Sequence, residues 1–173
     1  MNIDFRFDHP STFLICGSSG TGKSFLAVQF ILNKAQLLKN CPSKILLLYR
    51  EWQPIYEQIR SAFPDTVFYQ NYPASKSFHN LISKNSKNGG TLIFIDDLYI
   101  NSREAKIFDI ENLFCVQSHH LNVTVIMSVH HLFEKNFRKV SLNSKNIFLT
   151  NSPRDRSQVG YLARQAFPGT GDF

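Results

Sequence analysis

The stretch "GSSGTGKS", from Gly17 to Ser24, decides how this chain folds. It has the pattern G-x-x-x-x-G-K-[ST], and it stands between the apolar run "TFLIC" (12–16) and the amphipathic segment 24–39. An incidental surface turn is the alternative interpretation. A buried strand before the glycines and a helix after them instead indicate a tight turn whose backbone N–H groups converge on an anion at the helix N-terminus.

A nucleotide phosphate is the anion that this pattern predicts. The glycines allow the close turn, Lys23 reaches the β- and γ-phosphates, and the Ser24 hydroxyl is a ligand for Mg²⁺. The loop therefore supplies eight candidate nucleotide-binding residues, which are Gly17, Ser18, Ser19, Gly20, Thr21, Gly22, Lys23 and Ser24.

A second motif, "TLIFIDDL" (91–98), predicts hydrolysis as well as binding. Four apolar residues lead into Asp96 and Asp97, which places two carboxylates at the carboxyl end of a central strand. We expect Asp96 to hold Mg²⁺ through water and Asp97 to polarise the attacking water as general base. An acidic helix cap after a strand is the alternative.

Apolar runs and helix-like segments alternate along the chain. The expected strands are 12–16, 44–49, 66–70, 91–96, 123–129 and 146–150, each interpreted as buried on both faces. The expected helices are 24–39, 54–62, 78–86, 103–118 and 154–167. This order predicts an α/β domain with a mostly parallel sheet.

The composition fits one soluble domain over residues 1–173. Hydrophobic residues make up 43% of the chain and charged residues 18%, which excludes a disordered chain. No apolar run is long enough to span a membrane and no signal peptide is present, so we expect an intracellular protein without membrane contact. Three distant cysteines predict neither a disulfide framework nor a zinc site. The net charge of +6 is compatible with a nucleic-acid partner.

The strand "VTVIMSV" (123–129) follows the acidic strand and ends at His130. That order predicts a P-loop NTPase of the additional-strand (ASCE, RecA-like) type, in which this strand inserts between the other two and a residue at its tip senses the γ-phosphate. We assign the sensor to His130. An oligomeric ATPase commonly places an arginine in its neighbour's site. The candidates are Arg103, Arg138, Arg154 and Arg156, of which we favour Arg138.

Three longer stretches narrow the assignment. They are "YREWQPIY" (49–56), "FCVQSHHLNVTVIM" (114–127) and "VSLNSKNIFLTNSPRDRSQVGYLARQAFP" (140–168). Together with the two motifs, they resemble the DNA-packaging ATPases of the FtsK–HerA superfamily, of the poxvirus type found in large DNA viruses, virophages and Polinton-like elements. The resemblance spans nearly the whole chain.

The resemblance implies an ATP- and Mg²⁺-dependent motor that threads double-stranded viral DNA into a preformed capsid. It further implies a homo-oligomeric ring of five or six subunits, other packaging proteins as partners, and a location in the virus factory, nucleus or cytoplasm, at a capsid vertex. Relatives carry Gln where this chain has His130, so protonation of His130 would make the sensor pH-dependent. Relatives also tend to continue beyond the final "PGTGDF", which leaves three alternatives open: a truncated C-terminus, a compact member, or a member that lacks elements which help to close the ring.

Two other functions stay open from the sequence. One is a nucleotide-gated DNA-binding or assembly subunit that has lost turnover because of His130. The other is a small-molecule or nucleotide kinase with the same phosphate loop, which predicts phosphate transfer to an added acceptor.

Overall fold

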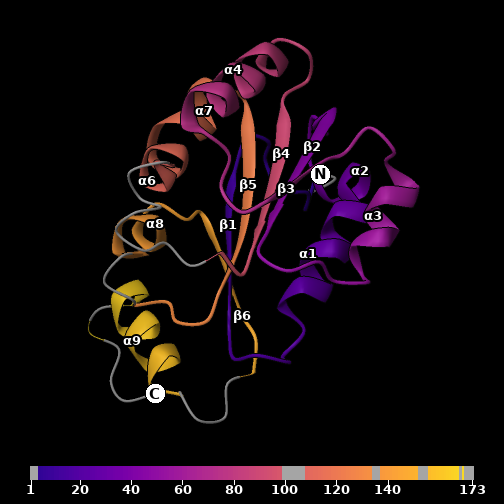
Figure 1. The fold of residues 1–173 in the computed structure, drawn as a ribbon. Coiled ribbons are helices and arrows are strands. Elements are labelled where there is room, and N and C mark those ends of the chain that lie inside the picture. The colour runs from indigo at the N-terminus through magenta and orange to yellow at the C-terminus, as the bar shows by residue number, and fades with distance from the viewer. Residues whose placement is uncertain (1–3, 99–107, 134–136, 152–155, 168, 170–173) are drawn as a thin grey trace.

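Six strands form one sheet in which every pair of neighbours is parallel, in the order β3-β2-β4-β5-β1-β6 (Figure 1). The computed structural model describes residues 4–98, 108–133, 137–151, 156–167 and 169. The strands are β1 (Thr12–Cys16), β2 (Lys44–Tyr49), β3 (Val67–Gln70), β4 (Thr91–Asp96), β5 (Val123–Val129) and β6 (Asn146–Leu149).

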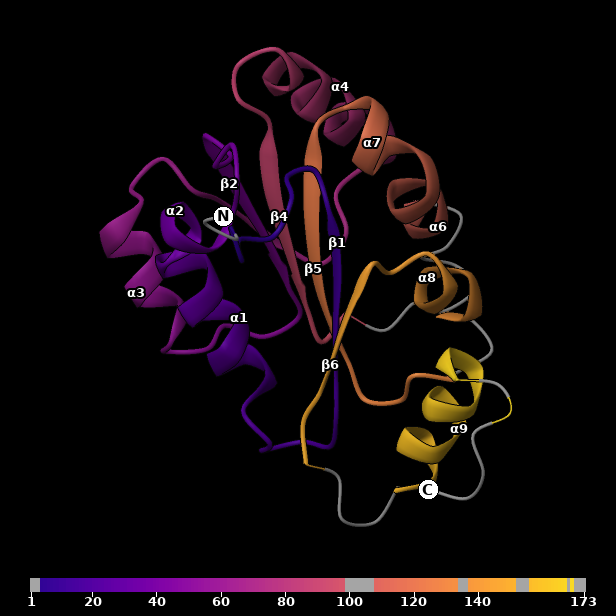
Figure 2. The ribbon, with the colours of Figure 1, turned by 180° about the vertical axis from the view of Figure 1, so that it is seen from behind.

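Helices cover both faces of this sheet (Figures 1 and 2). One face carries α1 (Lys23–Leu32), α2 (Lys34–Leu37) and α3 (Tyr56–Ala62). The other carries α4 (Ser75–Ser86), α6 (Ile110–Asn112), the π-helical turn η1 (Leu113–Gln117), α7 (Ser118–His120), α8 (Arg138–Leu142) and α9 (Ser157–Ala166). Each face has its own hydrophobic core, so the sheet is the middle of three layers.

Burial along the strands follows their position in the sheet. Every residue of β1, β4 and β5 is buried, as expected for strands with helices on both faces. The prediction that all six strands are buried on both faces is wrong for the two edges, because β3 and β6 are only partly buried. An edge strand has a neighbour on one side only, and its sequence pattern does not reveal this.

The inserted strand is where the sequence places it. β5 pairs with β1 on one side, with Leu14 opposite Met127, and with β4 on the other, with Ile93 opposite Val125. This order confirms the α/β P-loop fold with an additional strand. It also brings the carboxyl ends of β1, β5 and β4 side by side.

The helices differ from the prediction in detail. The expected helix 24–39 is divided at Asn33, whose side chain donates to Gln29 O at 2.8 Å, so that α1 and α2 are separate. A short helix, α8, was not predicted. Part of the expected helix 103–118 lies outside the described residues, and its described part contains α6 and η1. Among the described residues, no helix has both the length and the apolar character to cross a membrane.

Candidate nucleotide-binding site

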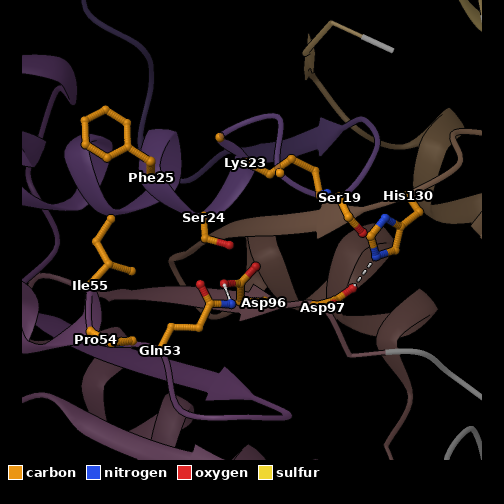
Figure 3. Close-up of a pocket in the computed structure, with 12 residues that line it drawn as sticks. Ser19, Lys23, Ser24, Phe25, Gln53, Pro54, Ile55, Asp96, Asp97 and His130 are labelled. Carbon is orange, nitrogen blue, oxygen red and sulfur yellow. Dashed lines mark hydrogen bonds and ion pairs between the residues drawn. The ribbon is translucent and has the colours of Figure 1, made fainter. Parts of the chain in front are cut away.

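The carboxyl ends of three inner strands lie side by side and border a cavity of about 450 Å³ (Figure 3). β1 leads into the glycine loop 17–22, β4 ends at Asp96, and β5 is followed by His130. Ligands of open parallel sheets bind outside the carboxyl ends of the strands. The cavity therefore lies where a ligand is expected, and Lys23, Ser24 and both carboxylates line it.

The loop turns into α1 at Gly22. Its φ of 87° lies in the left-handed region, which glycine adopts without the steric penalty of a side chain. Helix α1 begins at the next residue, and Leu26 N donates to Gly22 O at 2.8 Å to close the first turn. The first N–H groups of α1 are consequently presented at the cavity, where they are available to an anion.

Lys23 is the first residue of α1 and is only 7% exposed. Its Nζ donates to Ser18 O at 3.0 Å. Burial lowers the pKa of Lys23, and the nearby Asp97 and Asp96 carboxylates partly oppose that effect. The lysine is thus held inside the loop by a neutral carbonyl, an interaction that a phosphate oxygen could replace with a stronger, charged one.

The Asp96 carboxylate is buried, at 1% exposure, and is hydrogen-bonded at both oxygens. Ser128 Oγ on β5 donates to Oδ1, and Tyr56 Oη on α3 donates to Oδ2 at 2.6 Å. Gln53 Nε2 makes a longer contact with Oδ2, at 3.4 Å. Burial, followed by the charge of Asp96, raises the pKa of Tyr56 far above its usual range, so this phenol stays a donor. These donors fix the orientation of the carboxylate.

Asp97 is more open to the cavity, with 55% of its side chain exposed. Its backbone has a left-handed φ of 51°, an uncommon conformation for a residue with a side chain. Asp97 N donates to Ser128 Oγ at 3.0 Å, which supports that conformation. His130 Nε2 lies 2.7 Å from Asp97 Oδ1 (Figure 3). Asp97 and His130 therefore form a pair at the tips of β4 and β5.

The residues present fit a magnesium ion bound together with a phosphate. Ser24 and Asp96 both line the cavity and offer oxygen atoms, the ligands that Mg²⁺ prefers (Figure 3). Within the described residues, no group of three or more His, Cys, Asp or Glu side chains is arranged to hold a metal ion alone. An ion at this position would need phosphate oxygens and water to complete its coordination, which is how Mg²⁺ is commonly bound.

The structure brings most of the predicted site residues together. Ser19, Gly20, Gly22, Lys23, Ser24, Asp96, Asp97 and His130 line the cavity. Gly17, Ser18 and Thr21 do not line it but bond within or next to the loop: Gly17 N donates to Val129 O, and Thr21 Oγ1 donates to Ser18 O.

Of the four arginine candidates, the two among the described residues, Arg138 and Arg156, do not line this cavity. Arg138 is exposed at the start of α8, on the sheet face opposite α1 (Figures 1 and 2). Arg156 lines a second cavity of about 450 Å³ beside Cys16. Arg103 and Arg154 lie outside the described residues. No interaction with the phosphate loop is therefore assigned to any of the four, and the choice of Arg138 stays a prediction.

The sequence did not predict four residues that contact the predicted site residues. Tyr56 packs against Trp52, and its hydroxyl also donates to Asp96. Gln53, Ser128 and Thr150 were not singled out. Ser128 carries a weak signal, because a polar residue in an otherwise apolar strand needs a hydrogen-bond partner.

Comparison with solved structures finds this fold in "The cytoplasmic domain of EssC", with a TM-score of 0.56 and 15% sequence identity. The match covers 94% of this chain and 34% of that one, so this chain spans about a third of its neighbour. No family model matches the sequence, and no curated protein matches it. At this sequence identity the likeness supports the α/β fold alone.

Proposed function

We propose that this chain binds ATP with Mg²⁺ at the phosphate loop and hydrolyses it. The observation that carries the proposal is the presence of Lys23, Ser24, Asp96 and Asp97 around one cavity, contributed by two strand ends that β5 separates. Binding and hydrolysis need different groups, and this cavity has both. The sequence resemblance to the FtsK–HerA superfamily, together with the fold shared with the EssC cytoplasmic domain, supports an ATPase of that broad type.

Each of these residues has a distinct role in the proposed reaction. Lys23 would exchange Ser18 O for the β- and γ-phosphate oxygens, and the N–H groups at the start of α1 would bind the same phosphates. Ser24 and Asp96 would hold Mg²⁺, which neutralises charge that develops on the phosphates. Asp97 would accept the proton of the attacking water. His130, 2.7 Å from Asp97, would sense the γ-phosphate from the tip of β5.

The finer proposal is that hydrolysis drives double-stranded DNA into a viral capsid through a ring of five or six copies. The sequence resemblance in the stretches 114–127 and 140–168 supports it, together with the net charge of +6, which suits binding to the DNA backbone. In such a ring, an exposed arginine on one copy would complete the site of the next, and Arg138 is our candidate.

One observation favours a second function, a nucleotide-gated DNA-binding subunit with little turnover. His130 Nε2 lies 2.7 Å from Oδ1 of Asp97, the proposed general base. If that pair persists with nucleotide bound, the carboxylate is directed away from water, and the subunit binds ATP without cleaving it.

Phosphate release from ATP by the purified protein, with and without long double-stranded DNA, tests both functions. We expect release that DNA stimulates, and a loss of about 100-fold or more in Asp97→Asn because general-base catalysis is removed. Asp65→Asn, at an exposed position, is the matched control. An active Asp97→Asn variant would contradict the assignment of the base. Phosphate release by His130→Gln, with none by wild type or by the control variant His119→Gln, would establish the second function.

A further inference from the structure

Thr150 lies beside the phosphate loop although it is 129 residues from Thr21 in sequence. It directly follows β6, the edge strand that pairs with β1, and Thr150 N donates to Cys16 O at 2.9 Å. The ladder between β1 and β6 therefore continues one residue further, to the point where the loop begins. This backbone contact fixes where the Thr150 side chain starts.

The Thr150 hydroxyl is connected to the loop through Thr21. The two Oγ1 atoms are 2.6 Å apart, and Thr21 Oγ1 donates to Ser18 O at 2.8 Å. A hydroxyl has a single proton to donate. Thr150 Oγ1 also lies 3.2 Å from a second acceptor, Cys16 O, which already accepts from Thr150 N. The arrangement in which Thr150 donates to Thr21, and Thr21 to Ser18 O, uses the shorter contacts of 2.6 and 2.8 Å, so we take Thr150 as the donor to Thr21. The result is a chain of two hydrogen bonds from the edge strand to the loop backbone.

Ser18 O is the carbonyl to which Lys23 Nζ also donates, at 3.0 Å. On the proposed function, Lys23 leaves this carbonyl when it binds a phosphate. Thr21 then remains as a donor to Ser18 O, so the carbonyl keeps a hydrogen bond and the loop keeps its conformation when Lys23 moves. The Thr150 hydroxyl holds Thr21 in the orientation that this requires.

Thr150 also packs directly against the loop. A Cβ built on Gly17 would overlap the Thr150 hydroxyl and would approach Thr21 Oγ1 to 3.0 Å. The space that a side chain at position 17 would need is thus filled by Thr150. This close approach gives a local reason for glycine at the first position of the motif.

We propose that Thr150 is a positioning residue, which holds the phosphate loop in its binding conformation through Thr21 and Ser18. The inference rests on the proposed nucleotide binding for its functional consequence, but the hydrogen-bond chain itself belongs to the nucleotide-free protein.

Two variants of Thr150 separate its hydroxyl from its shape. Thr150→Val keeps the size and removes the donor, whereas Thr150→Ser keeps the donor. Thr66→Val is the matched control, since Thr66 Oγ1 donates to Phe63 O at 2.7 Å and also lies partly buried, before β3 at the other edge of the sheet. Urea unfolding of each variant checks that all three fold.

Two measurements are made on each protein. The first is hydrogen exchange of the amides at 17–24 without nucleotide, and the second is the affinity for a fluorescent ATP analogue. We expect faster exchange and about three- to tenfold weaker binding in Thr150→Val, the loss of one ordinary hydrogen bond, with values near wild type in Thr150→Ser and Thr66→Val.

Exchange in Thr150→Val that equals wild type would overturn the inference, as would equal changes in Thr66→Val, which would indicate a general loss of stability. Failure of Thr150→Ser to restore wild-type values would also overturn it, because the hydroxyl would then not be the cause. A wild-type protein that binds no nucleotide would refute the proposed function, while the exchange result would still decide whether Thr150 holds the loop.

Discussion

Replacing Tyr56 by Phe removes one oxygen atom from the interior of the protein. Tyr56 is fully buried, and its hydroxyl donates at 2.6 Å to Asp96, which is itself 1% exposed. Without this donor, the 3.4 Å contact with Gln53 is the one that Asp96 Oδ2 keeps among the described residues. A hydrogen bond to a charged group contributes about 1.5–3 kcal/mol, so we expect Tyr56→Phe to lower the free energy of unfolding by about 2 kcal/mol.

Urea unfolding at pH 7 measures this loss. With a slope of about 1–3 kcal/mol per molar urea, it moves the midpoint down by roughly 1 M. Tyr69→Phe is the control, because Tyr69 is half-buried and its hydroxyl has no hydrogen-bond partner among the described residues. A midpoint in Tyr56→Phe no lower than in Tyr69→Phe would refute the view that this phenol supports the Asp96 carboxylate.

The same variant predicts a pH dependence. The pKa of Tyr56 in the folded state is raised well above its ordinary value of 10.0, mainly by burial. Above pH 10 the unfolded chain therefore loses this proton while the folded protein keeps it, and the free energy of unfolding falls as pH rises. The difference between wild type and Tyr56→Phe should be complete below pH 10 and shrink above it.

Three further predictions follow from single contacts. Gly17→Ala should weaken binding of an ATP analogue because its methyl group would overlap Thr150, and the double variant with Thr150→Gly should recover part of the loss in the same assay. Lys23→Met should abolish that binding. Its urea midpoint should nevertheless be at least as high as that of wild type, because burial lowers the pKa of Lys23 and makes its charge costly. The difference in midpoint should shrink as pH rises toward 10.5. Burial also lowers the pKa of His9 in the folded protein, so as the pH falls through the ordinary value of 6.5 the unfolded chain takes up a proton before the folded protein does. Wild type should therefore lose stability between pH 7.5 and 5.5, and His9→Gln should lose less, as measured by urea unfolding.

The sequence predicts the centre of the sheet well and its margins less well. The strands around the P-loop and the acidic pair were predicted with their observed bounds because unbroken apolar runs, such as 91–96, are flanked by turn or polar residues. At the edges, the same kind of pattern did not distinguish half-buried β3 and β6 from buried strands. The division at Asn33 depends on one side chain bonding to the backbone of its own helix, which competes with helical propensity.

The candidate site likewise contains residues that the sequence predicts and residues that it does not. Residues within a motif, such as Lys23 and Asp97, are placed by local sequence alone. Their partners come from elsewhere in the chain: Tyr56 is 40 residues from Asp96, and Ser128 is 32. Such pairs depend on strand order and helix packing, so no local pattern predicts them.

The position of β5 has a mechanical consequence. It separates the strand that leads to Lys23 from the strand that ends at Asp96, a span of two strand spacings, or about 10 Å. A ligand that contacts both residues would bridge this span and act as a clamp across three strands. Pulling β1 away from β4 would then require breaking the ligand contacts as well as the backbone ladders. Loading the cavity would therefore stiffen the centre of the sheet, and emptying it would leave that centre easier to shear.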